Sequence, residues 1–194
     1  STVAFHEKQR YHMAMYERRL SFESARKDSF FLWGVRQTGK TFLLKERFSD
    51  CLYINLLNAK ERIPLQAAPQ LLREQVLADA RARKKRVIID EIQKVPALLD
   101  EVHSLIEDER ILFGLCGSSA RKLKRGHANL LGGRALRFEL YGLSATEVGP
   151  SWSLNRMLNR GYLPRLYDHD NPKAAWRSYV QDYLKEEILE EGLV

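Results

Sequence analysis

The sequence predicts an α/β protein: a five-stranded parallel sheet covered by helices on both faces, followed by a small helical lid. Three observations predict this fold class. Short apolar runs alternate with stretches of helical spacing along most of the chain. Its 194 residues, 44% hydrophobic and 29% charged, suit one globular domain with a small appendage. A glycine-rich segment separates the first apolar run from the next helical stretch.

Five apolar runs are the predicted strands, and they differ in character. The third and fourth are continuously apolar, as strands buried on both faces are, whereas the fifth alternates between apolar and polar residues. In chain order they are 29–33 (SFFLW), 51–57 (CLYINLL), 86–90 (RVIID), 111–117 (ILFGLCG) and 135–143 (ALRFELYGL).

Apolar residues at helical spacing predict the segments that connect and cover these strands. A long stretch from about 60 to 85 is interrupted near Pro64 and Pro69, because proline breaks a helix. The predicted helices are 7–27, 41–48, roughly 60–85, 97–109 and 119–131.

The alternation of strands and helices fades near residues 144–153, where Gly149 and Pro150 predict a domain boundary. We therefore expect a core over residues 1–148 and a helical lid over residues 149–194. The last helix of the lid is expected from about 173 to 191. The final residues, EEGLV, are a poor domain ending, which suggests that a further C-terminal part is missing.

Charge and cysteine content indicate which partners and which redox environment suit the protein. Lys and Arg number 32 against 25 Asp and Glu, so the net charge is 32 − 25 = +7, which is compatible with a nucleotide or nucleic-acid partner. Cys51 and Cys116 each lie in an apolar run and are expected to be buried free thiols in a reducing, cytoplasmic setting. No run approaches the roughly 18 apolar residues that span a membrane. No histidine has metal-ligand spacing.

The segment GVRQTGKT matches the phosphate-loop pattern G-x-x-x-x-G-K-[ST], between a predicted strand and a predicted helix. The glycines let backbone N–H groups surround an anion, and the helix N-terminus adds partial positive charge. Lys40 is expected to contact the β- and γ-phosphates of ATP or ADP, and the Thr41 hydroxyl to ligate Mg²⁺. The predicted nucleotide-binding residues are Gly34, Val35, Arg36, Gln37, Thr38, Gly39, Lys40, Thr41 and Phe42.

The acidic partner of this loop is predicted in RVIIDEIQ. Asp90 falls at the carboxyl end of its strand, where open α/β sheets bind ligands, and is expected to hold Mg²⁺ through a water. Glu91 follows it and is the candidate general base. A glutamate in this place, and a strand candidate between the loop strand and the acidic strand, indicate the additional-strand, catalytic-glutamate type of P-loop NTPase. With no guanine-reading N-K-x-D in the chain, ATP is favoured over GTP.

Three later positions are weaker candidates. Ser118 or Ser119 ends the fourth predicted strand and is either a sensor near the γ-phosphate or a helix N-cap. Arg134 precedes the fifth strand and is expected to reach a γ-phosphate, in its own site or in that of a neighbouring subunit of a homo-oligomer, unless it is a plain surface arginine. Pro164 lies in a loop that either packs on the adenine ring or is only a helix–helix turn.

Together these stretches resemble one family, the AAA+-like ATPases predicted in bacteria and archaea. The resemblance rests on GVRQTGKT, IIDEIQKVP, GSSARKL, NLLGGRALRFELYGLSATEVG and GYLPRLY with WRSYVQDYLKEEI. It implies an ATPase core, a helical lid, and a further C-terminal domain, often described as nuclease-like, that this chain does not contain. The family's nucleotide site matches at Gly34, Gly39, Lys40, Thr41, Asp90 and Glu91, and its later motifs at Ser118, Arg134 and Pro164.

Two other functions stay open at the level of sequence. The chain is alternatively a slow nucleotide-dependent switch whose output is a bound partner. A nucleic-acid role is allowed by the net charge and by the basic runs RARKKR (81–86) and RKLKR (121–125). Both runs are also explained as solvated helix ends, and neither has the interleaved aromatic residues of a single-strand binding surface.

Overall fold

The computed structural model describes residues 16–79, 86–118 and 131–191, with side chains as far as residue 183. The chain divides into two compact units. The sheet unit comprises Leu20–Arg36 and Lys40–Leu140, and the C-terminal unit comprises Ser1–Arg19, Gln37–Gly39 and Tyr141–Val194. The domain boundary expected at residue 149 stays a prediction.

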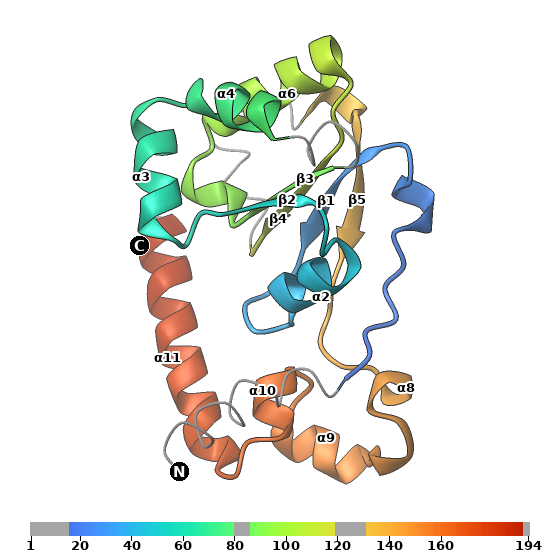
Figure 1. Cartoon of the computed structure of the whole chain (residues 1–194). Helices are drawn as coiled ribbons and strands as arrows, with labels where there is room; N and C mark the ends of the chain where they lie inside the picture. Colours follow the sequence, from blue (N-terminus) through green and yellow to red (C-terminus); the bar gives the residue numbers. More distant parts are fainter. Residues whose placement is uncertain (1–15, 80–85, 119–130, 192–194) are drawn as a thin grey trace, which may run out of the picture. The chain divides into compact units, whose positions relative to one another are not determined.

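A five-stranded parallel sheet forms the centre of the sheet unit, as predicted (Figure 1). Its order in space is β2-β3-β4-β1-β5. The three inner strands are buried at every position, and the edge strand β5 has its side chains mostly exposed. The bounds are β1 Ser29–Trp33, β2 Leu52–Asn55, β3 Val87–Asp90, β4 Phe113–Gly117 and β5 Ala135–Glu139.

The position of β4 distinguishes this sheet from the order of its strands in the sequence. β4 lies between β1, which precedes the phosphate loop, and β3, which carries the acidic pair. The strand that lies between them along the sequence, β2, is at the edge of the sheet. The additional strand of the predicted fold type is therefore β4, and it brings Ser118 to the same edge as the loop.

The helices of the sheet unit differ from the prediction in two places. The described part of the expected helix 7–27 has only the short 3-10 helix η2, and residues 16–22 have no regular structure. The stretch 60–85 is interrupted at Pro69, as expected, because Ala68 precedes this proline and has a non-helical backbone. The interruption expected at Pro64 is wrong, because Pro64 lies inside a continuous helix. The elements are η2 Glu23–Ala25, α2 Lys40–Arg47, α3 Ala59–Ala67, α4 Leu71–Ala78, η3 Ile92–Lys94, α6 Leu98–Glu109 and η4 Leu131–Gly133. The helix expected over 119–131 lies outside the described residues, apart from its last position.

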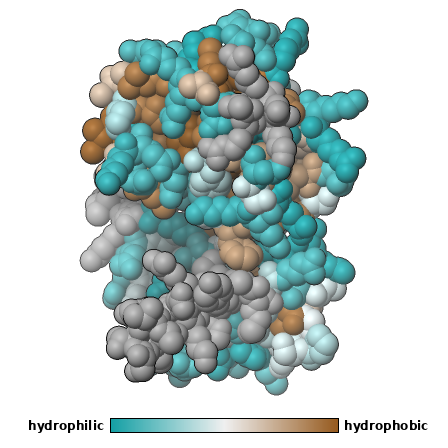
Figure 2. Space-filling model, viewed as in Figure 1, coloured by the Kyte–Doolittle hydropathy of each residue, from teal (hydrophilic) through white to brown (hydrophobic). Residues whose placement is uncertain are grey.

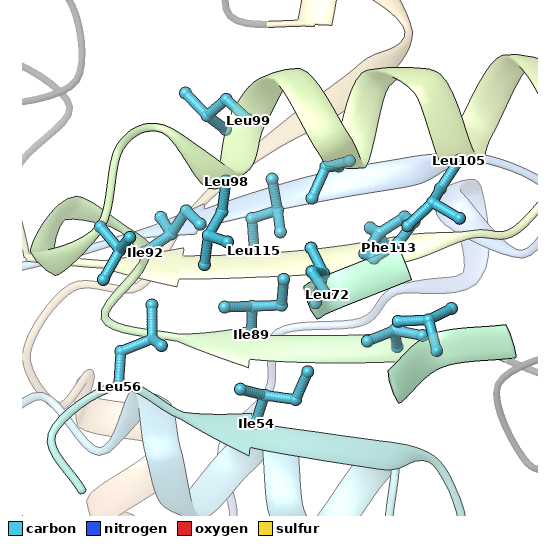
Figure 3. Packing of buried hydrophobic residues seen from close by; sticks show 14 of the residues in the cluster. Ile54, Leu56, Leu72, Ile89, Ile92, Leu98, Leu99, Leu105, Phe113 and Leu115 are labelled. Atoms are coloured by element: carbon cyan, nitrogen blue, oxygen red, sulfur yellow. The ribbon is translucent and has the colours of Figure 1, made fainter. Parts of the chain in front are cut away.

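Two hydrophobic clusters fill the faces of the sheet. On one face α4 and α6 pack their apolar side chains onto β3 and β4 (Figure 3). Leu72, Leu98 and Leu105 are fully buried there against Ile89 and Leu115. On the other face α2 packs Leu43 and Leu44 onto the sheet. The two clusters explain why the inner strands are buried at every position.

The α2 face also contains a group of aromatic rings. Phe22, Phe30, Phe48 and Phe138 come from four different segments, with ring centroids 4.7 to 5.7 Å apart. Arg86 covers this group, with its guanidinium 4.8 Å from the centroid of the Phe30 ring. Arg86 is 5% exposed, so this one described residue of the basic run 81–86 is a core residue that no nucleic acid can contact.

The C-terminal unit is helical, as the predicted lid is. A small core of Tyr16, Leu143, Val148, Met157 and Tyr167 holds it together. The final helix begins at Pro172, close to the predicted start at 173. Its elements are α8 Ala145–Val148, η5 Gly149–Ser151, α9 Leu154–Arg160, α10 Pro164–Tyr167 and α11 Pro172–Glu191.

The surface is mainly hydrophilic in the view of Figure 2, with apolar residues gathered over α3 and α4. Leu57 and Ile63 are the large apolar side chains exposed near this region, at 56% and 60%. Cys51 and Cys116 are buried free thiols, as predicted. Within the described ranges, no helix combines the length and the apolar character that crossing a membrane requires.

Candidate functional site

The phosphate loop follows β1 directly, and its last two residues, Lys40 and Thr41, begin α2. Because all strands run parallel, the loop lies at the carboxyl edge of the sheet, where such sheets bind ligands. Gln37 and Gly39 have left-handed backbone angles, with φ of 65° and 92°. Glycine adopts this conformation freely, but Gln37 does so at a cost of about 1 kcal/mol or more. Strain of this kind is typical of ligand-binding loops.

Lys40 is almost completely buried, with 6% of the residue exposed. Its ammonium group donates hydrogen bonds to the carbonyl oxygens of Gly34, at 2.6 Å, and Val35, at 3.0 Å. A buried cation without such acceptors would be costly, so the two carbonyls stabilise the charge at the loop itself. The side chain is thus held against the loop, and its contact with phosphate stays a prediction.

The loop and the acidic strand meet through one hydrogen bond. The Thr41 hydroxyl donates to Asp90 Oδ2 at 2.6 Å, and the hydroxyl of Tyr53 donates to the same oxygen, also at 2.6 Å. Asp90 is completely buried at the end of β3. Its other oxygen, Oδ1, is buried and accepts no hydrogen bond from the residues that the structure describes. Buried carboxylate oxygens are normally paired, so Oδ1 fits the hydrated cation that such a site binds.

Two groups beside Asp90 are kept in their protonated form. Burial, the nearby charge of Asp90 and the hydrogen bond to it raise the pKa of Tyr53 far above its usual range. Burial and then the charge of Asp90 raise the pKa of the Cys116 thiol, which lies opposite Asp90 in the paired strands. Tyr53 therefore acts as a permanent donor, and Cys116 as an uncharged packing residue.

Glu91, the candidate base, lies beside the predicted sensor position. Its backbone is left-handed, with φ of 61°. Gln93, in the 3-10 turn that follows, donates from Nε2 to Glu91 Oε2 and, at 3.1 Å, to Ser118 Oγ. Gly117 makes this possible, because a Cβ there would lie 2.5 Å from Gln93 Oε1. The side chains of Glu91, Gln93 and Ser118 are thus connected by hydrogen bonds at the carboxyl edge of β3 and β4.

Within the described part of the sheet unit, Arg134 is not part of this cluster. Arg134 precedes β5 and is level with the start of β1, so it lies a strand's length, about 16 Å, from the carboxyl edge. It pairs with Glu107 of α6. A role in the site of its own chain has no support from this placement, and a role in a neighbouring subunit stays a prediction. Pro164 begins α10 in the C-terminal unit, and Ser119 lies outside the described residues.

Arg18 is a residue whose importance sequence reasoning missed. It is 4% exposed and its Nε donates to Glu147 at 2.9 Å. Its other nitrogens donate to the carbonyl of Thr38, a loop residue of the same unit, and to that of Tyr141, at 2.8 Å. Burial opposes ionisation of Glu147, but hydrogen bonds from the backbone of Arg19 and Ser144 and from Arg18 outweigh it and lower the pKa.

Tyr53 and Gln93 were also missed as site residues. Gln93 was visible as part of the stretch DEIQ, which carried the family resemblance without an assigned role. Tyr53 had no signal of its own, because a tyrosine in an apolar strand is typical of any sheet. For Arg18, the available signal was the capping pattern S-x-x-E at Ser144–Glu147, which is formed and whose glutamate pairs with the arginine.

The described residues contain no cluster of three or more His, Cys, Asp or Glu side chains that could hold a metal by itself. Thr41 and Asp90, which share a hydrogen bond, stay the candidate magnesium residues predicted from the sequence, and phosphate oxygens would supply other ligands, as is usual for Mg²⁺ at nucleotide sites.

Comparison with known proteins places the chain in a family. Residues 26–149 match the family described as AAA domain. Uncharacterised proteins of Mycobacterium tuberculosis and Mycobacterium bovis are each 30% identical over 113 residues, 55% of this chain. The match covers 25% of those proteins, so the chain spans about a quarter of the length of these curated relatives. Among solved structures, a Walker-type ATPase of Pyrococcus abyssi superposes with a TM-score of 0.51 at 16% identity.

That alignment covers 94% of this chain and 74% of the archaeal one, and it shows likeness of fold. The family match covers well over half of the chain. The resemblance noted from the sequence is thereby confirmed. The chain belongs to the AAA-domain family of P-loop ATPases and is a nucleotide-binding domain of that type.

Proposed function

We propose that the chain binds ATP together with Mg²⁺ at the phosphate loop and hydrolyses it to ADP and phosphate. The observation that carries this proposal is the 2.6 Å hydrogen bond from Thr41 to Asp90, which joins the loop to the acidic strand in a buried position. Bound magnesium would neutralise charge on the β- and γ-phosphates. Lys40 would bind the same phosphates, since its ammonium already lies at the loop.

In the proposed reaction a water oxygen forms a bond to the γ-phosphorus while the bond to the bridging oxygen breaks. ADP leaves with that oxygen. Glu91 accepts a proton from the attacking water, which is the role of a general base. The position of Glu91 supports this assignment, because Gln93 links its carboxylate to Ser118, the predicted sensor beside the γ-phosphate.

Replacing Lys40 by Ala tests the binding half of the proposal. We expect it to abolish measurable ATP binding in calorimetry, a loss of at least about a hundredfold for a charge-assisted contact. Lys60→Ala is the matched control, because Lys60 is an exposed lysine in the first turn of another helix. Unchanged affinity in Lys40→Ala would contradict the assignment of the loop.

Replacing Glu91 by Gln tests the catalytic half. We expect ATP affinity to stay within about twofold and turnover to fall about 10²- to 10⁴-fold, as for loss of a general base. Glu74→Gln, at an exposed position of α4, controls for the charge change. An undiminished rate of hydrolysis in Glu91→Gln would refute the role of Glu91.

The second candidate is a slow nucleotide-dependent switch, and one contact favours it. Gln93 donates a hydrogen bond to the Glu91 carboxylate. While this bond is present, the carboxylate oxygen is less available to accept a proton from water, which would slow hydrolysis. Steady-state hydrolysis by the full-length protein separates the two functions. Repeated turnover supports the ATPase, whereas one bound nucleotide per chain without phosphate release supports the switch.

Arg134 offers a separate proposal about assembly. It is 42% exposed and lies at the opposite edge of the sheet from the loop, so we propose that it serves the site of a neighbouring copy. Mixing Glu91→Gln with Arg134→Ala chains tests this, because each variant keeps what the other lacks. Recovered hydrolysis in the mixture supports a homo-oligomer with a shared site, and the sum of the two separate rates contradicts it. Nucleic-acid binding and a cytoplasmic location stay predictions.

A further inference from the structure

Asp90 is held by a side chain from a different strand. Tyr53 belongs to β2, and its backbone pairs with Ile88 of β3. Because alternate residues of a strand share a face, Tyr53 and Asp90 lie on the same face, one diagonal step apart. Such diagonal neighbours are about 7–8 Å apart at the backbone, a gap that a long side chain bridges. The tyrosine hydroxyl does so, at 2.6 Å from Asp90 Oδ2.

Asn55, the residue directly opposite Asp90, is committed elsewhere. Its side-chain Oδ1 accepts a hydrogen bond from the backbone N–H of Leu57, at 3.0 Å, in the turn after β2. Its backbone N–H donates to Glu61. Asn55 therefore serves the turn, and among the described residues of β2 it is Tyr53 that donates a hydrogen bond to the Asp90 carboxylate.

The two oxygens of Asp90 are treated differently by the protein. Oδ2 accepts two short hydrogen bonds, from Thr41 and Tyr53, whereas buried Oδ1 accepts none from the described residues. A hydroxyl that ligates a cation through its oxygen still donates its own proton, so Thr41 keeps its contact with Oδ2 when it binds metal. Oδ2 is therefore the oxygen of Asp90 that contacts the loop residue Thr41, whereas Oδ1 is left for another partner.

We propose that Tyr53 is a positioning residue for magnesium: its hydroxyl holds Asp90 Oδ2 and leaves Oδ1 for the hydration shell of the cation. The inference rests on the proposed function and assigns it a further residue. Partners that orient a metal-binding carboxylate commonly contribute about 10- to 100-fold to metal affinity. The tyrosine ring also lies under the Lys45 ammonium, 5.2 Å from the ring centroid, so hydroxyl and ring must be tested separately.

The test compares ADP affinity, measured by calorimetry, in excess Mg²⁺ and in excess EDTA. The ratio of the two affinities is the magnesium enhancement, and it needs no turnover. Tyr53→Phe keeps the ring and its contact with Lys45 while removing the hydroxyl. We expect the enhancement to fall about tenfold, with ADP affinity in EDTA within about twofold of the wild type. The unchanged affinity in EDTA also shows that the variant is folded.

Lys45→Gln is the matched control, because it removes the cation over the ring and keeps the hydroxyl. We expect it to leave the magnesium enhancement unchanged. An equal fall in both variants overturns the inference, since the hydroxyl would then have no role of its own. If the magnesium enhancement in Tyr53→Phe equals that of the wild type, the inference about Tyr53 is overturned, but the proposed use of Mg²⁺ is not. A wild-type protein without any magnesium enhancement overturns the proposed use of Mg²⁺, and this inference with it.

Discussion

Removal of the buried Arg18–Glu147 ion pair is the sharpest stability test that the structure offers. Arg18→Met keeps the length of the side chain and removes every hydrogen bond of the guanidinium. The side chains of the pair are 4% and 6% exposed, with nitrogen and oxygen 2.9 Å apart. Breaking a buried pair by removing one partner costs about 3–5 kcal/mol, because the other charge is left buried without compensation. The carbonyl of Thr38 loses its donor as well.

Urea unfolding of the full chain, followed by circular dichroism, measures this loss. Arg137→Met is a matched control, because Arg137 pairs with Glu139 at the same 2.9 Å but with side chains 52% and 39% exposed. An exposed pair contributes about 0–1 kcal/mol. We expect the two variants to differ by about 2–5 kcal/mol in the free energy of unfolding.

A double-mutant cycle with Glu147→Gln separates the pair from other contacts of Arg18. If Arg18→Met costs no more than Arg137→Met, burial does not decide the strength of these pairs, and the reasoning is refuted. If the cycle shows no coupling with Glu147, the loss comes from the carbonyl contacts instead.

Three further predictions follow from the same contacts. Because folding lowers the pKa of Glu147, its stabilising contribution is complete above the unfolded value of about 4.3 and is lost as pH falls through the lower folded pKa; Glu147→Gln should flatten the acid side of a plot of stability against pH. Gln93→Met removes the donor to Glu91 and should change kcat for ATP while ADP affinity stays constant, and an equal change in both would indicate a structural role. Gly114→Ala places a Cβ 2.7 Å from the Phe30 ring and should lower the free energy of unfolding by about 1–3 kcal/mol in a urea titration, whereas wild-type stability would show that the core yields.

Local pattern determined much of this protein from its sequence alone. The apolar runs became the five parallel strands, because continuous hydrophobicity reports burial on both faces. The phosphate loop could be predicted from the sequence, because its glycines and Lys40 lie close together in the chain and act through the backbone around them. Asp90 was predictable because a polar residue that ends a buried strand falls at the ligand-binding edge.

Tertiary structure alone decided which distant residues meet. The insertion of β4 between β1 and β3 depends on strand pairing, which no local pattern specifies, and it sets Ser118 beside Gln93. Tyr53 reaches Asp90 only through the register of β2 and β3, in which paired residues such as Leu52 and Val87 are 87 − 52 = 35 positions apart in the sequence. The contact energies responsible act between groups far apart in the chain, whereas periodicity records only whether each residue faces the core or the solvent.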